Sequence, residues 1–206
     1  MLRSFPLFSA LSLTAVLAVA CSGGGTDLGP SATLGTAPTT ATTSPAPDPS
    51  VIPADPAAID EAYVQAVVDA LFAVDAKATK IFVETKDITN KEALEYLRAI
   101  YVPEEFERQV NVWFQALALR ADRLLPGTLR NDVQRVIDVT PDCVYAQVLR
   151  DYSQTTKRDV GQQAVFLGLT PSHEAADGNL NPTPWVMFMN GLNPDGSEPE
   201  NPCEGR

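Results

Sequence analysis

The hydrophobic pattern of the chain has a helical period in its middle third. Between Val64 and Phe82, apolar side chains recur every three or four positions, which is typical of one face of an amphipathic α-helix. The stripe consists of Val64, Val67, Val68, Leu71, Val74, Ala78, Ile81 and Phe82. Asp55-Pro56 precedes it, and Asp is a favourable N-cap while Pro fits the first helical position. We therefore expect a long helix that begins at Pro56.

Two shorter helices are predicted next. The sequence TNKE has the spacing of a capping box from Thr89 to Glu92, which predicts a short helix through Tyr101. A third helix is expected from Pro103, because proline and the two following acids suit a first helical turn. The stretch LLPG, residues 124–127, should end it. Its expected inner stripe is Phe106, Val110, Trp113, Leu117, Ala121 and Leu124.

The apolar period then changes to two, as in β-strands. The turn signal TPD at 140–142 separates two alternating runs, which predicts a β-hairpin. In the first run, Val133, Arg135, Ile137 and Val139 alternate with Gln134 and Asp138. In the second, Val144, Ala146 and Val148 alternate with Cys143, Tyr145 and Gln147. QQAVFLGLT, residues 162–170, is apolar on both faces and should be a central strand, and TPWVMFMNG, residues 183–191, a fourth strand. Helices followed by antiparallel strands predict an α+β fold with the helices on one sheet face.

This order of elements, over roughly residues 56–191, resembles the nuclear-transport-factor-like superfamily, an α+β cone. The resemblance implies a curved sheet of about four strands that wraps a helix and leaves a pocket. Some members of that superfamily are enzymes and others only bind ligands. Trp113, Tyr145, Phe166 and Trp185 are candidates for lining such a pocket, although large aromatic side chains are more often core residues.

The first 20 residues have the form of a secretory signal peptide. Arg3 precedes an apolar run that ends in small residues. As a helix, the run from Phe5 to Ala20 would be about 24 Å long, shorter than the roughly 30 Å hydrocarbon core of a bilayer. No later segment of the sequence is apolar enough to span a membrane. We therefore expect residues 1–20 to be removed on export.

Cys21 follows the sequence Ala18-Val19-Ala20, and together they resemble a bacterial lipobox; the layout of the chain is similar to that of actinobacterial exported lipoproteins. The resemblance implies cleavage before Cys21 and attachment of diacylglycerol to its sulfur. Two or three acyl chains hold a protein stably on a membrane, whereas one is marginal. Because the same tripeptide suits ordinary signal cleavage, a secreted protein is the alternative. The lipobox favours an extracytoplasmic lipoprotein. Its acylated N-terminus would insert into the lipid at the outer face of the cell membrane.

The three cysteines support an exported protein. If Cys21 is lipidated, Cys143 and Cys203 are left to pair in an oxidising compartment. A bridge that closes a loop of about 60 residues contributes roughly 4 kcal/mol in the chain-entropy model. We expect this disulfide to pin the C-terminal tail across the sheet.

Residues 21–54 are rich in Gly, Thr, Ser, Ala and Pro and contain few large apolar side chains. Such a segment buries too little surface to offset its ordering entropy, so we expect a disordered tether. Its coil span would be about 30 Å and its stretched length near 100 Å. The chain is thus expected to comprise a signal peptide at 1–20, a tether at 21–54 and a single domain at 55–206.

The charge balance is acidic. The chain has 15 Lys and Arg against 26 Asp and Glu, a net charge of −11. Removal of the leader takes away only Arg3, which leaves 14 basic and 26 acidic side chains and a net charge of −12. This balance argues against nucleic acid as a partner and against direct adhesion to anionic lipid, because both require basic patches.

Candidate catalytic chemistry is sparse. The single histidine, His173, lies in a Pro-, Asp- and Gly-containing loop sequence, and a zinc site or a Ser-His-Asp triad would require it. We expect no cofactor and no metal. A carboxylate site could draw on six scattered residues, most of which should lie on solvated faces: Asp69, Asp75, Glu84, Glu95, Asp132 and Asp138.

Three functions are compatible with these features. The first is a non-enzymatic head that binds a small apolar molecule or an envelope protein. The second is an enzyme of isomerase or dehydratase type that uses a pocket carboxylate. The third is an accessory domain of cell-envelope or transport machinery. A pocket carboxylate beside a Tyr or His would favour the enzyme, and a filled interior with an exposed apolar sheet face would favour the accessory domain.

Overall fold

A computed structural model describes residues 46–172, 180–193 and 196–204. These residues belong to one compact unit, Ser44–Arg206. The helices are η1 (Pro56–Ala58), α1 (Glu61–Thr85), α2 (Lys91–Ile100), α3 (Pro103–Arg120) and η2 (Ala121–Arg123), of which η1 and η2 are short 3₁₀ turns. The strands are β1 (Arg130–Thr140), β2 (Cys143–Asp151), β3 (Gln162–Pro171) and β4 (Trp185–Gly191).

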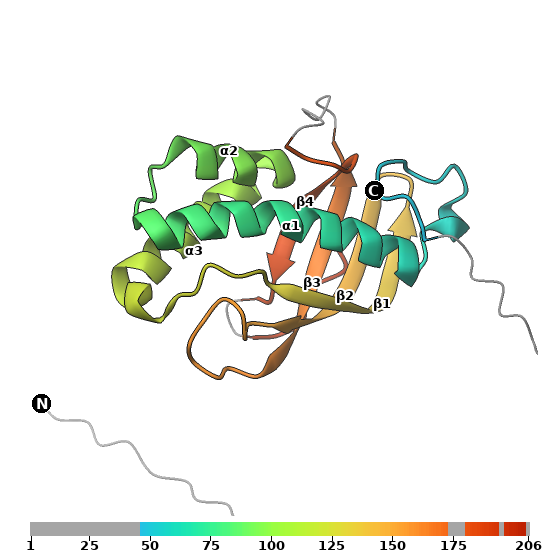
Figure 1. The fold of residues 1–206 in the computed structure, drawn as a ribbon. Helices are drawn as coiled ribbons and strands as arrows, with labels where there is room; N and C mark the ends of the chain where they lie inside the picture. The colour runs from blue at the N-terminus through green and yellow to red at the C-terminus, as the bar shows by residue number, and fades with distance from the viewer. Residues whose placement is uncertain (1–45, 173–179, 194–195, 205–206) are drawn as a thin grey trace, which may run out of the picture. The chain divides into compact units, whose positions relative to one another are not determined.

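The four strands form one antiparallel sheet in the order β1-β2-β3-β4, so β2 and β3 are the central strands. Helix α1 crosses one face of this sheet, with α2 and α3 beside it (Figure 1). The main apolar core lies between α1, α2 and that sheet face. The predicted α+β class, with three helices before four antiparallel strands, is confirmed.

The long helix begins later than predicted. Asp55 does act as a cap, but only for η1, where its side chain accepts a hydrogen bond from the Ala57 amide at 3.0 Å. Asp60 caps α1 instead and accepts from the Tyr63 amide at 2.9 Å. The prediction was wrong because the sequence offers two favourable caps, and the second lies directly before the first buried helical turn.

The predicted capping box of the second helix is also wrong. Asn90 caps α2 and accepts from the Ala93 amide at 3.2 Å. Thr89 lies one residue outside the cap and donates its hydroxyl proton to Asp87 at 2.7 Å. Asn is as favourable an N-cap as Thr, and a position nearer to the helix decides which of them caps it.

Helix α3 begins at Pro103 as predicted, but it ends at Arg120, before the LLPG stretch. Its predicted inner stripe is only partly buried, and Glu105 is its one fully buried residue. Phe114 and Leu119 are 56% and 75% exposed. Helix α3 therefore lies at the margin of the core rather than inside it.

Strand β1 does not keep the predicted alternation. Its register with β2 shifts between Val133 and Arg135 and again between Val136 and Asp138. The resulting pairs are Val133 with Val148, Val136 with Ala146 and Val139 with Val144. Two β-bulges thus bring every third residue of β1 to the core face, whereas β2 alternates as predicted.

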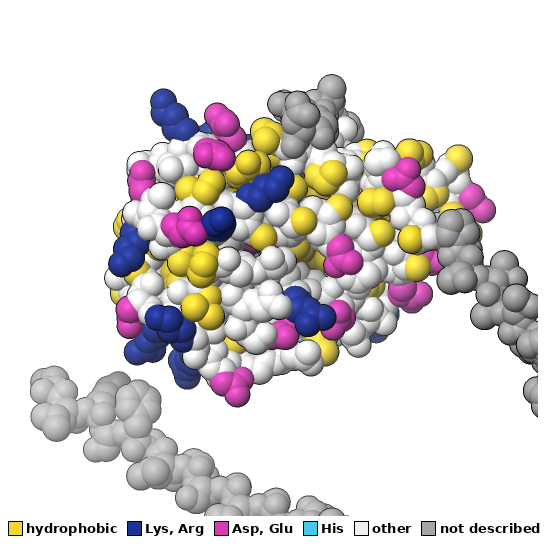
Figure 2. Space-filling model, viewed as in Figure 1, with side chains coloured by type: hydrophobic (Ala, Val, Ile, Leu, Met, Phe, Trp, Pro, Cys, Tyr) yellow, Lys and Arg dark blue, Asp and Glu magenta, His cyan; other side chains and the backbone are white. Residues whose placement is uncertain are grey.

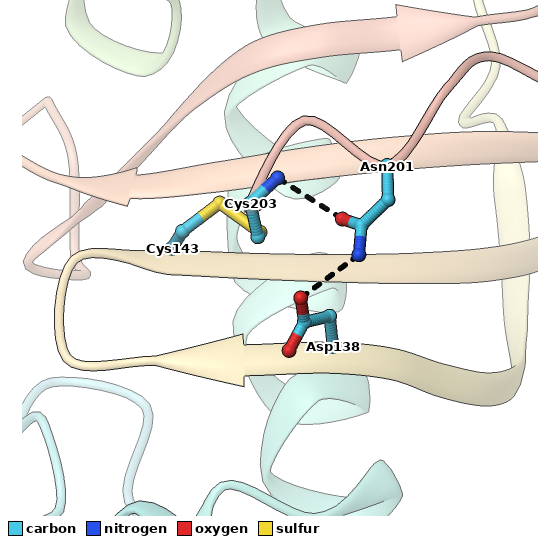
Figure 3. Close-up of a disulfide and its surroundings, with 4 residues drawn as sticks. All are labelled: Asp138, Cys143, Asn201 and Cys203. Carbon is cyan, nitrogen blue, oxygen red and sulfur yellow. Dashed lines mark hydrogen bonds between the residues drawn. A yellow bond between two sulfur atoms is a disulfide. The ribbon is translucent and has the colours of Figure 1, made fainter. Parts of the chain in front are cut away.

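A disulfide joins the C-terminal tail to the sheet. Cys143 at the start of β2 is bonded to Cys203, 60 residues later (Figure 3). Asn201 turns back beside it, accepting from the Cys203 amide at 3.0 Å and donating to the Asp138 carboxylate at 2.8 Å. The predicted disulfide is confirmed.

The tail covers a second apolar cluster on the sheet face opposite α1. The rings of Tyr145 and Phe166 stack there with centroids 5.6 Å apart, and the Tyr145 hydroxyl donates to the Pro199 carbonyl at 3.0 Å. Phe188 of β4 packs over Gly168 of β3 so closely that a Cβ there would lie 2.6 Å from the ring. Glycine at this position lets the aromatic ring lie flat on the sheet.

Candidate functional site: a buried polar network under helix α1

Among the buried polar and charged residues, a group of six lies inside the apolar core, each at most 6% exposed. They are Asp75 and Thr79 of α1, Tyr101 at the end of α2, Asn131 of β1, Arg150 of β2 and Asn190 of β4. Buried charges are costly unless other polar groups satisfy them. The hydrogen bonds among these six side chains therefore decide what the site can do.

The helical period of α1 places Asp75 in the core. Leu71, Asp75, Ala78 and Phe82 follow one another at spacings of four, three and four, and all four are buried. The expectation that a carboxylate lies on a solvated face is wrong for Asp75, because its helical phase overrides its polarity. The other carboxylates considered are exposed, apart from the half-buried Asp138.

Strand alternation places Arg150 in the same layer. Arg150 shares the inward parity of Val144, Ala146 and Val148, whose side chains belong to the main core. Its guanidinium lies over the Phe72 ring, 5.1 Å from the centroid. A charged side chain at an inward position is thus the signal in the sequence that could have located this site.

Arg150 is held by two asparagines. Its Nε donates to Asn131 Oδ1 at 2.7 Å, and its Nη2 donates to Asn190 Oδ1 at 2.6 Å. Asn190 Nδ2 in turn donates to the Tyr101 hydroxyl oxygen at 3.0 Å. The charge of the guanidinium is therefore satisfied by amide oxygens from both edge strands of the sheet.

Asp75 lies at the other end of this chain of hydrogen bonds. Thr79 Oγ1 donates to Asp75 Oδ2 at 3.3 Å, and the Tyr101 hydroxyl is hydrogen-bonded to the same carboxyl group. Because the Tyr101 oxygen accepts from Asn190, its own proton is free to bond the carboxylate. Asn190 and Tyr101 thus connect Arg150 with Asp75. The ion pairs found in the described part of the chain do not include a direct pair between Arg150 and Asp75.

A second charged pair adjoins the network at the start of α3. Glu105 accepts from Arg108 Nε at 2.7 Å and from Gln109 Nε2 at 2.7 Å. Arg108 also donates to the backbone carbonyl of Asn190. Asn190 is therefore fixed by both its side chain and its backbone, which orients its amide between Arg150 and Tyr101.

The network has a characteristic electrostatic state. Burial raises the pKa of Asp75 to about 6, opposed first by the positive charge of Arg150 and then by the hydrogen bonds from Thr79 and Tyr101. Burial, reinforced by the negative charge of Asp75, raises the pKa of Tyr101 well above its ordinary value of 10. Tyr101 therefore remains a proton donor at neutral pH, whereas Asp75 exchanges its proton slightly below neutrality.

A cavity of about 400 Å³ lies between α1 and the start of β1. It is lined by Gln65, Asp69, Phe72, Thr128, Leu129, Arg130, Asn131 and Asp132. Phe72 and Asn131 also contact Arg150, so the cavity reaches the outside of the network but not Asp75 or Tyr101. A second cavity, of about 310 Å³, lies in the loop between β2 and β3.

The four aromatic residues predicted as pocket candidates lie in different places. Trp185 is fully buried in the main core, and its Nε1 donates to the Tyr63 hydroxyl at 2.8 Å. Trp113 is half-buried at the margin of that core, whereas Tyr145 and Phe166 lie under the tail on the other sheet face. None of the four lines either cavity described above.

Cys21 and His173, which the sequence singled out, lie outside the described residues. Across residues 46–172, 180–193 and 196–204, no helix has the length and apolar character needed to cross a membrane. The same part of the chain contains no group of three or more His, Cys, Asp or Glu side chains that would hold a metal ion.

Comparison of the chain with protein-family models, with curated proteins and with solved structures gave no match.

Proposed function

We propose that this protein is an extracytoplasmic lipoprotein, attached through Cys21 to the outer face of the cell membrane, with a non-enzymatic binding head. The lipobox-like sequence supports the anchor, and the disulfide between Cys143 and Cys203 is in keeping with an oxidising compartment. The order of helices and strands supports the resemblance to the nuclear-transport-factor-like cone.

The observation that carries the non-enzymatic assignment is the closure of the polar network. Asp75 and Tyr101 are 5% and 4% exposed, and their hydrogen-bond partners are other core side chains. A network of this kind stabilises one arrangement of helices and strands and leaves no free polar group for a substrate. Binding then takes place at the surface, where the described residues expose six large apolar side chains, three of them on α3.

The anchor is tested by replacing Cys21 with serine and fractionating the cells. The wild-type protein should remain with the membranes after high-salt washing, and Cys21→Ser should be released into the medium or the soluble fraction. Ser22→Ala is the matched control and should fractionate as the wild type. Retention of Cys21→Ser on the membrane to the wild-type extent would overturn the lipoprotein assignment.

A second candidate function is an enzyme of isomerase or dehydratase type, which one observation favours. A carboxyl group with a pKa of about 6 lies hydrogen-bonded to a tyrosine hydroxyl, a pair suited to moving protons near neutral pH. A substrate would have to reach Asp75 past Phe72 and Asn131 from the adjoining cavity. Native mass spectrometry tests this: a small molecule retained by the wild type and lost in Asp75→Asn would favour the enzyme.

A further inference from the structure

The C-terminal part of α3, after the glutamates of its first turns, differs in charge from the rest of the molecule. From Arg108 to Ala121 the sequence contains no carboxylate, although the whole chain has 26 acidic against 15 basic residues. Val112, Phe114 and Leu119 in this stretch are 49%, 56% and 75% exposed. Val112 and Leu119 are seven residues apart and so share one face of α3, which gives this part of an acidic protein exposed apolar side chains without a carboxylate in the same stretch.

Basic side chains gather where α3 ends. Lys157, in the loop between β2 and β3, donates from Nζ to the Asp122 carbonyl at 2.9 Å and from its amide to the Arg123 carbonyl at 2.8 Å. These contacts bring residues 119–123 and 157–160 together, a surface that we call the basic end. It carries four exposed cations and two exposed carboxylates: Arg120, Arg123, Lys157 and Arg158 against Asp122 and Asp159. Figure 2 shows dark-blue side chains grouped at this end of the molecule.

We propose that the basic end is a docking surface for anionic phospholipid and that it lays the head on the membrane that anchors the chain. The chemistry is that of interfacial binding: Arg and Lys attract acidic headgroups, while an apolar side chain such as Leu119 enters the boundary of the acyl region. The exposed Val160, at 37%, adds apolar surface beside the cations. The net negative charge of the remaining surface turns it away from the membrane, so the basic end fixes the orientation of the head.

Because of the proposed anchor, a low affinity of the basic end for lipid is sufficient to keep the head on the membrane. The segment between Cys21 and the compact unit at Ser44, which its composition predicts to be a disordered tether, would hold the head at a high effective concentration near the bilayer. Four cations and two apolar side chains then need to supply only a low intrinsic affinity. The inference rests on the proposed function for its setting, but the affinity belongs to the head and is measurable without the anchor.

The test uses the mature chain, residues 21–206, with Cys21→Ser so that it carries no lipid. Co-sedimentation is measured with vesicles of phosphatidylglycerol and with vesicles of phosphatidylcholine. We expect binding to phosphatidylglycerol that weakens as salt is added, and little binding to phosphatidylcholine. Arg120→Glu/Arg123→Glu should lower the partition coefficient at least about tenfold, and Leu119→Ser should lower it several-fold.

The matched control is Lys80→Glu/Lys91→Glu, which makes the same change in net charge at exposed positions of α1 and α2. It should alter the partition coefficient by no more than about twofold. Absence of binding to phosphatidylglycerol, equal binding to both lipids, or equal losses in the two double variants would each overturn the proposal. None of these outcomes bears on acylation of Cys21, which the fractionation of Cys21→Ser decides separately.

Discussion

Asp75 is a carboxyl group that the fold buries beside a tyrosine and a threonine rather than in a direct ion pair. Removing a charged group from water is costly, and here the cost is lowered by hydrogen bonds and by the field of Arg150. An equally sized apolar side chain would avoid that cost. The network therefore has its main value in specificity, because it fixes which faces of α1, β2 and β4 meet.

The raised pKa of Asp75 makes the free energy of unfolding depend on pH. The folded protein keeps this proton up to a pH of about 6, whereas the unfolded chain loses it near the ordinary value of 3.8. The free energy of unfolding should therefore fall as the pH rises from about 4 to 6 and stay level above pH 6. One pH unit corresponds to 1.36 kcal/mol, so the total fall should be roughly 3 kcal/mol. Urea denaturation at a series of pH values measures the slope.

The control for this prediction is a carboxylate on the same helix. Asp75→Asn should flatten the slope between pH 4 and 6, whereas the exposed Asp69→Asn should leave it unchanged. Asp48, Asp87 and Asp151 have pKa values lowered by hydrogen bonds to Ser50, Thr89 and Ser153, so their contribution is lost only as the pH falls below about 3.8. A stability that rises between pH 4 and 6 would contradict the raised pKa of Asp75.

Arg150 and Asp75 should be energetically coupled although they do not touch. Arg150→Met leaves the carboxylate without its compensating positive charge and two asparagine oxygens without a donor, so it should cost about 3–5 kcal/mol. In Asp75→Asn/Arg150→Met the total cost should be smaller than the sum of the two single costs. A double-mutant cycle of unfolding free energies tests this, and strict additivity would show that the two charges act independently.

At the scale of elements, the C-terminal tail depends on its covalent link to β2. Cys143→Ser/Cys203→Ser removes the loop constraint and should lower the unfolding free energy by about 2–5 kcal/mol. It should also release the tail, so that limited proteolysis cleaves near the C-terminus before the core unfolds. Asn201→Ala, which removes only the hydrogen bonds to Asp138 and the Cys203 amide, is the control and should cost about 1 kcal/mol. Proteolysis of the double variant at the wild-type rate would show that packing alone holds the tail.

The contact between β3 and β4 allows no side chain at Gly168. Gly168→Ala would place a methyl group 2.6 Å from the Phe188 ring and should lower the unfolding free energy by about 1–3 kcal/mol, measured by urea denaturation. In the Phe188→Leu background the same substitution should cost less, because the ring is gone. An equal cost in both backgrounds would mean that the ring does not set the requirement for glycine.

The elements of this fold were predictable where one local signal dominates. The periods of α1 and β2 gave the correct faces because each pattern is repeated over several turns or residues. Helix starts were misplaced where two good caps compete, as Asp55 and Asp60 do. The bulges of β1 were missed because they depend on pairing with β2, which the strand sequence alone does not contain.

For the whole molecule, the sequence predicted the disulfide and the α+β arrangement but not the site. The apolar periods of α1 and β2 place Asp75 and Arg150 at inward positions, but the polarity of Asp75 favours a solvated face. The hydrogen-bond path through Asn190 and Tyr101 joins residues from α2 and β4 that are 89 positions apart. Only the tertiary arrangement brings such residues together.

The proposed lipoprotein has a disulfide-linked head that acyl chains on Cys21 hold at the outer face of the cell membrane. The most direct measurement is the intact mass of the mature protein extracted from membranes, taken with and without reductant. We expect the mass of residues 21–206 plus glycerol and two or three fatty acyl chains, and an increase of two hydrogens on reduction. The unmodified mass of residues 21–206 would contradict the anchor, and a mass unchanged by reductant would contradict the disulfide.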